Sequence, residues 1–145
     1  MSVRENIAAN LLSVISNISS PDIKKATRQP FQLDELSEQQ YPAVIVQTSE
    51  ENRDDSELGT GARTRHGTID FVVLGFVKGS DSNIDTLRNA LITAIETAIE
   101  TDITRDSNAL DSEVIQVETD EGSLFPVGGI RMTIRCMYEY QAGTP

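Results

Sequence analysis

The sequence contains few of the residue types that support catalysis or a disulfide framework. Its 145 residues include one cysteine, one histidine and no tryptophan, and aromatic residues make up 5%. A single cysteine, Cys136, cannot form an internal disulfide, so nothing in the sequence requires an oxidising compartment. Because Cys136 lies within an apolar alternation, we expect a small buried side chain rather than a reactive thiol.

Basic residues are also scarce. Twelve Lys and Arg residues face 23 Asp and Glu residues, which gives a formal net charge of -11. This balance argues against a grip on nucleic-acid phosphates, which needs a basic stripe, and against docking on anionic lipid. An acidic surface suits a protein that stays soluble at high concentration, or one that lines a path along which DNA must slide without sticking.

Long hydrophobic runs are missing as well. The first 18 residues, MSVRENIAANLLSVISNI, have neither the continuous apolar core of a signal peptide nor the length and apolarity of a membrane span. A chain of 145 residues is long enough to bury one core. We therefore expect one domain, residues 1–145, in a soluble intracellular protein.

Two segments have the periodicity of amphipathic helices. Ser2 and Glu5 form a capping box ahead of an apolar stripe at helical spacing: Val3, Ile7, Leu11, Val14, Ile15 and Ile18. Ser82 and Asp85 predict the start of a second helix, with the stripe Ile84, Leu87, Leu91, Ala94, Ile95, Ala98 and Ile99. Both stripes need an apolar surface to cover them.

The remaining apolar segments predict strands. The clearest is the closing run, in which Ile130, Met132, Ile134, Cys136, Tyr138 and Tyr140 alternate with mostly polar residues. Further strands are expected near 43–48, 67–79 and 113–119, with a weak edge strand near 22–31 and a turn or two of helix near 33–40. The fold class that follows is α+β: a two-layer sandwich with a mostly antiparallel sheet of 4–5 strands and two main helices on one face.

Two polar regions are candidates for contact with a partner. The first is a long charged loop expected at about 49–66, which carries side chains of both signs: Arg53, Asp54, Asp55, Glu57, Arg63 and Arg65. The second is the closing turn and strand, with Asp120, Glu121 and Phe125 in the turn and Arg131 and Arg135 on the polar side of the strand. For the loop, an idle solvated segment is an equally good interpretation; for the turn, apolar residues that fold back onto the sheet edge are the alternative.

Catalytic patterns are not found. His66 is the only histidine, and a metal ligand or general base needs partners that the sequence does not place near it. The glycines at 59, 61, 128 and 129 do not follow a strand and open a helix with a phosphate-binding lysine. We therefore predict no enzymatic activity, no cofactor and no metal.

Three motifs in order resemble those of one family. They are Y-P-A-x-x-V followed by two acids (Tyr41 to Glu51), L-R-N-A-L-x-x-A-I (Leu87 to Ile95), and T-D-E-G-x-x-x-P-x-G-x-x-x-M-x-I-x-x-x-Y (Thr119 to Tyr138). Together they resemble the tail-terminator, or tail-completion, proteins of long-tailed bacteriophages and related phage-derived particles. The closing motif is the most specific, and the resemblance covers most of the chain.

The resemblance implies a structural protein of the virion tail or neck, assembled in the host cytoplasm. It implies a homo-oligomeric ring, usually hexameric, that caps the tail tube protein, ends tube growth and joins the head connector. DNA would pass through the lumen without specific binding, and no membrane is involved. The alternatives are a head-closure or other neck protein and, from a different class, a small enzyme or ligand-binding domain.

Overall fold

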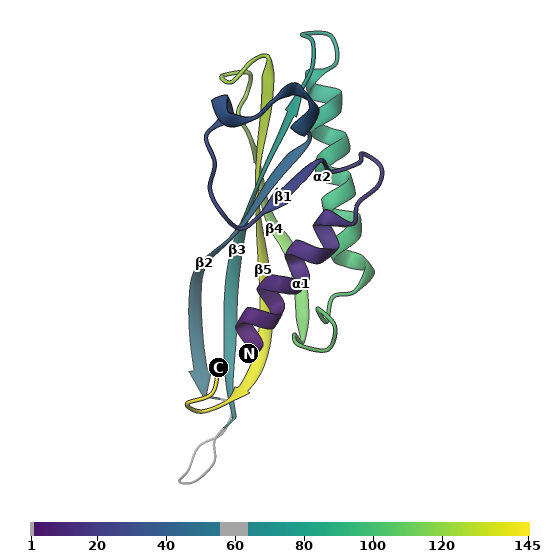
Figure 1. Ribbon diagram of the computed structural model, residues 1–145. Helices are drawn as coiled ribbons and strands as arrows, with labels where there is room; N and C mark the ends of the chain where they lie inside the picture. The colour runs from purple at the N-terminus through teal and green to yellow at the C-terminus, as the bar shows by residue number, and fades with distance from the viewer. Residues whose placement is uncertain (1, 56–63) are drawn as a thin grey trace.

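The computed structural model describes residues 2–55 and 64–145, which form two helices and five strands (Figure 1). In chain order these are α1 (Val3–Ser16), β1 (Lys25–Thr27), the short 3-10 turns η1 (Leu33–Glu35) and η2 (Glu38–Gln40), β2 (Ala43–Asp55), β3 (Thr64–Lys78), α2 (Ile84–Thr101), β4 (Asp111–Thr119) and β5 (Val127–Gln141). The expected α+β class is confirmed.

The five strands form one sheet in the order β1-β2-β3-β5-β4. Only β1 and β2 are parallel, and every other neighbouring pair is antiparallel. The apolar β3 is the central strand, and it pairs with β5 from Thr64–Gln141 to Lys78–Val127. The weak strand β1 lies at one edge, as its short length and Lys25 predict.

The core lies between the two helices and one face of the sheet. All six apolar residues of the closing alternation are buried there, and the helices add Ile7, Leu11 and Ile15 from α1 and Leu91, Ile95 and Ile99 from α2. Figure 1 shows both helices on this side of the sheet. The opposite side lacks both α-helices, and we call it the helix-free face. It carries the alternate residues, among them Asp70 and Val72 of β3 and Arg131, Thr133 and Arg135 of β5. The segment that contains η1 and η2 contacts one end of this face, at Phe76 and Lys78 of β3.

The expectation of a long loop over 49–66 is wrong at both ends of that range, where the chain forms strands. β2 continues to Asp55 and β3 begins at Thr64, with paired residues as far as Asp55–Arg65. Residues 49–55 are all polar, so their side chains carry no strand periodicity. Main-chain pairing with the long β3 extends the strand instead, across a register shift between Thr48 and Glu51.

The two helix starts have different outcomes. Ser2 is the N-cap of α1, and its hydroxyl accepts the Glu5 N–H at 3.2 Å, as expected. The expected cap at Ser82 is wrong, because α2 has Asn83 as its N-cap residue. The Asn83 side chain does not cap the helix; it accepts the backbone N–H of Ser80 at 2.8 Å and closes the turn before it.

The end of α2 is built around a buried arginine. Arg105 has no exposed surface, and its guanidinium donates to the carbonyl oxygens of Ile99, at 2.6 Å, and of Asp102. Arg105, Asp106 and Ser107 all have positive φ, which reverses the chain toward β4. A cation beside the last carbonyls of a helix is favourable, because it satisfies acceptors that have no partner within the helix.

Candidate interaction surfaces

The turn between β4 and β5 is held by one carboxylate. Asp120 accepts the backbone N–H groups of Leu124, at 3.0 Å, and Gly129, at 3.1 Å, and the guanidinium of Arg88 at 2.7 Å. Burial acts to raise the pKa of Asp120, but these three donors outweigh it, so the pKa lies below its ordinary value. The side chains of Arg88 and Asp120 are only 9% and 6% exposed. The pair therefore ties α2 to the turn from inside.

Gly128 makes room for this pair. A Cβ atom at Gly128 would lie 2.9 Å from Cγ of Arg88 and 3.0 Å from Cγ1 of Ile84. Of the three turn residues proposed as contacts, Asp120 is thus engaged within the chain, whereas Glu121 and Phe125 are exposed. The T-D-E-G-x-x-x-P-x-G pattern serves first to build this turn, and it leaves Phe125 at the surface.

A second buried network lies toward the end of β2, where β2 pairs with the start of β3. The carboxylate of Glu51 accepts the hydroxyl of Tyr138 at 2.8 Å, Nε of Arg4 at 3.3 Å and Nε of Arg53. Burial acts to raise the pKa of Glu51, but the Tyr138 and Arg53 donors give a net lowering. For Tyr138, burial and the Glu51 carboxylate together raise the pKa to about 12.

The residues expected in the charged loop are therefore strand residues where the structure describes them. The Arg53 guanidinium also lies over the Tyr140 ring, 5.0 Å from its centroid, and Asp54 pairs in register with His66. Arg65, the register partner of Asp55, is half-buried at the start of β3. Asp55 is the last described residue of β2, and Glu57 and Arg63 lie outside the described residues.

The helix-free face carries ion pairs that join neighbouring strands. Arg135 binds Asp70 through two bonds of 2.9 and 3.1 Å, and Arg131 lies 3.9 Å from Glu118. His66, considered in the sequence as a lone ligand or base, has its Nε2 2.8 Å from a Glu139 carboxylate oxygen. The polar side of the closing strand is thus free of helices, as expected, but its arginines are paired within the chain.

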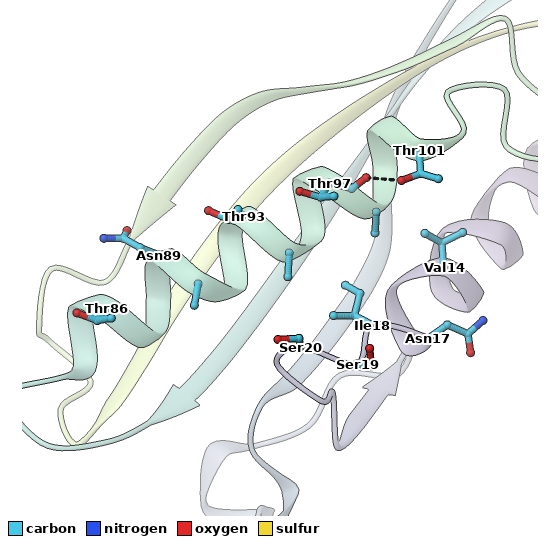
Figure 2. Close-up of a pocket in the computed structure, with 13 residues that line it drawn as sticks. Val14, Asn17, Ile18, Ser19, Ser20, Thr86, Asn89, Thr93, Thr97 and Thr101 are labelled. Carbon is cyan, nitrogen blue, oxygen red and sulfur yellow. Dashed lines mark hydrogen bonds between the residues drawn. The ribbon is translucent and has the colours of Figure 1, made fainter.

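An open groove of about 950 Å³ runs between α2 and the end of α1 (Figure 2). Thr86, Asn89, Thr93, Thr97 and Thr101 line it along α2, with Ala90, Ala94 and Ala98 between them. The α1 side supplies Val14, Asn17 and Ile18 and is followed by Ser19 and Ser20. All 13 lining residues are neutral, so the groove offers hydrogen bonds and small apolar surfaces but no titrating group.

Within residues 2–55 and 64–145, no group of three or more His, Cys, Asp or Glu side chains is placed to hold a metal ion. In the same part of the chain, no helix combines the length and apolarity needed to cross a membrane.

Sequence reasoning missed the two buried networks. Glu51 and Arg88 belong to the sequence motifs, but each also binds a residue far away along the chain: Glu51 binds Tyr138, and Arg88 binds Asp120. For Arg88 a signal was present, because it lies on the apolar stripe of its helix, four residues after Ile84 and three before Leu91. Glu51 has no such signal, since neither Ser49 nor Arg53 is a core residue.

Comparison with known proteins gives little family information. No family model matches the chain, and no curated protein matches it. Among solved structures, it is similar to a chain described as "Virion of native gene transfer agent (GTA) particle", with a TM-score of 0.48 and 13% sequence identity, over 96% of this chain and 92% of that chain. At that level the similarity carries no argument about function.

Proposed function

We propose that the protein is a structural component of a phage-like particle, a tail terminator that forms a ring on the tail tube and ends its growth. The proposal is supported by the three ordered sequence motifs and by the α+β fold that they imply. It is also supported by the way the closing motif is used: Asp120 and Gly128 of that motif build the turn and its contact with α2.

The observation that carries the proposal is the charge of the helix-free face. Its described strand residues include six acids, Asp54, Asp70, Asp111, Glu113, Glu118 and Glu139, against four permanent cations, Lys25, Lys78, Arg131 and Arg135. Both arginines lie beside carboxylates of the same face. A ring with this face toward its axis presents DNA phosphates with a repulsive surface, which lets DNA pass without binding.

The exposed candidates at the two ends of the sheet are then contacts to the tube and the connector. Glu121 and Phe125 lie in the turn between β4 and β5, and Arg53 and Asp54 lie near the end of β2; Figure 1 shows this turn and this strand end at opposite ends of the molecule. An apolar side chain within an acidic turn suits the centre of a protein interface, where aromatic residues contribute most of the affinity.

The test is removal of the gene from a particle-producing strain, followed by electron microscopy. We expect tail tubes that exceed the normal length and do not join heads. Normal tube length with failed head joining would indicate a head-closure protein instead. Native mass spectrometry of the purified chain should show a hexamer, and a chain that is monomeric in assembled tails would refute the ring.

A further inference from the structure

We propose that neighbouring copies join by antiparallel strand pairing, with the outer edge of β4 in one copy bound to the free part of β2 in the next. This inference rests on the proposed ring and identifies its interface. In a closed ring of more than two copies, each interface joins two different surfaces. Each copy therefore needs one surface for the neighbour on one side and another surface for the neighbour on the other side.

The sheet supplies two such surfaces. β4 is the last strand in the order β1-β2-β3-β5-β4, so no described strand pairs with its outer edge. At the other side, β1 pairs only with Ala43, Val44 and Ile45 of the 13-residue β2. The rest of β2 has no strand on that side among the described residues, and in Figure 1 it forms the left border of the molecule.

The two free edges lie at the same level of the sheet. Gln116 of β4 pairs with Thr133, Thr133 with Val72, and Val72 with Gln47 of β2. Further along, Asp111 pairs with Met137, Met137 with Thr68, and Thr68 with Asn52. Free β4 and free β2 therefore share the rows between Gln47 and Asn52, and a rotation without a large shift along the strands brings them together.

The strand directions also fit. β4 is antiparallel to β5, β5 to β3, and β3 to β2, so β4 and β2 run in opposite directions. Rotation about an axis along the strands keeps each direction unchanged. The β4 edge of one copy thus meets β2 of the next as an antiparallel pair. β2 and β4 each contain a register shift, which begins after Thr48 in β2 and after Val114 in β4. Thr48 and Val114 lie in the same row across the sheet, so both edges are irregular at the same level.

The β4 edge exposes apolar side chains, and its protection against pairing is limited to three acids and the register shift between Val114 and Gln116. Ile115 and Val117 are 40% and 41% exposed on it, and the strand contains neither lysine nor proline. Edge strands that stay unpaired normally carry such residues, as β1 does with Lys25. The partner that fits is a second copy, since its free β2 stretch matches the length, level and direction of this edge.

Engineered cysteines test this pairing directly. Gln47→Cys and Gln116→Cys are combined in one chain, because both residues lie in the same row on the helix-free face. Within a chain they are separated by β3 and β5, roughly 14 Å at three strand spacings, which exceeds the reach of a disulfide. The native Cys136 is fully buried and does not interfere.

Oxidation of the double variant at concentrations that give rings should produce a ladder of covalent multimers on a non-reducing gel, removed by reductant. Asn52→Cys with Gln116→Cys, and Gln47→Cys with Glu113→Cys, cover shifted registers. The matched control is Gln47→Cys with Thr133→Cys, in which the second cysteine lies one strand inside the edge and should give no ladder.

The outcomes separate the interface from the ring. Hexamers that give no ladder in any of the three registers would overturn the strand pairing and leave the proposed function standing. A covalent dimer from Gln116→Cys alone would show β4 paired with itself, which also overturns the proposal. A chain that stays monomeric at every concentration refutes the ring and this interface together.

Discussion

Replacement of Asp120 by Asn should destabilise the protein more than replacement of any exposed acid in the turn. The substitution keeps the size of the side chain and removes its charge. It leaves the buried guanidinium of Arg88 with Asp85 as its remaining carboxylate, bound at 3.0 Å and largely exposed to solvent. It also replaces one carboxylate oxygen by an amide nitrogen, which cannot accept the N–H of Leu124 or Gly129.

The expected loss follows from the burial of the pair. Removal of one partner from a buried ion pair costs about 3–5 kcal/mol when the other charge is left buried without a partner. Arg88 keeps the exposed Asp85, so we expect a loss at the lower end of this range, about 3 kcal/mol. For a domain near this size, a loss of about 3 kcal/mol lowers the melting temperature by roughly 6–12 °C. The exposed pair of Arg131 and Glu118 is the control: Glu118→Gln should change stability by about 0–1 kcal/mol.

Denaturant unfolding at pH 7 and at low pH measures this prediction. Because the pKa of Asp120 is lowered in the folded protein, its contribution is present above the unfolded-state pKa and is lost as pH falls through the folded-state value. The difference in the free energy of unfolding between the native protein and the Asp120→Asn variant should therefore become smaller in acid. A loss below about 1 kcal/mol at pH 7, or a gap that does not change with pH, would refute the role given to this pair.

Two further substitutions test the other buried network. Gly67→Ala would place a Cβ atom 2.5 Å from Cε1 of Tyr138, so we expect a loss of about 1–3 kcal/mol in denaturant unfolding, relieved when Tyr138 is also replaced by Leu; no relief would contradict the clash. Tyr138→Phe removes the bond to Glu51 and should cost about 1–3 kcal/mol. In the native protein, a spectrophotometric titration should find one tyrosine that ionises near pH 12, absent from this variant. Since the pKa of Tyr138 is raised on folding, the stability linked to it is present below pH 10 and is lost toward pH 12. A titration in which all tyrosines ionise together would exclude the network.

Much of the fold could be predicted because it depends on local periodicity. The alternation from Ile130 to Tyr140 and the stripe from Ile84 to Ile99 have no competing interpretation, and both elements lie where the pattern placed them. Residues 49–55 could not be predicted as strand, because their conformation depends on pairing with β3 rather than on their own side chains. The connector after α2 conceals Arg105, whose burial depends on carbonyl groups at the helix end.

The candidate contacts were predicted from charge, which indicates exposure only on average. Asp120 and Arg135 were chosen as surface charges, and the structure binds each to a residue far along the chain. Glu121, Phe125 and Asp54 are exposed, and their role as contacts stays a prediction. The difference is physical: a carboxylate next to backbone N–H groups in a tight turn is drawn inward, whereas its neighbours in the same turn have no such donors.

The position of the buried networks explains how the edges of the sheet can be left open. Asp120 fixes α2 to the turn at one end of the sheet, and Glu51 fixes α1 to β2 and β5 toward the other. Between them, β3 and β5 pair along 15 residues each. The monomer therefore does not depend on added strands to stay folded, and exposed residues of the free edges contribute little to its core. Val117→Lys should leave the free energy of unfolding within about 0.5 kcal/mol of the parent while it blocks hexamers. Met137→Lys, an equally exposed substitution on the interior strand β5, should leave hexamers intact, and loss of hexamers in both variants would contradict this separation of folding from assembly.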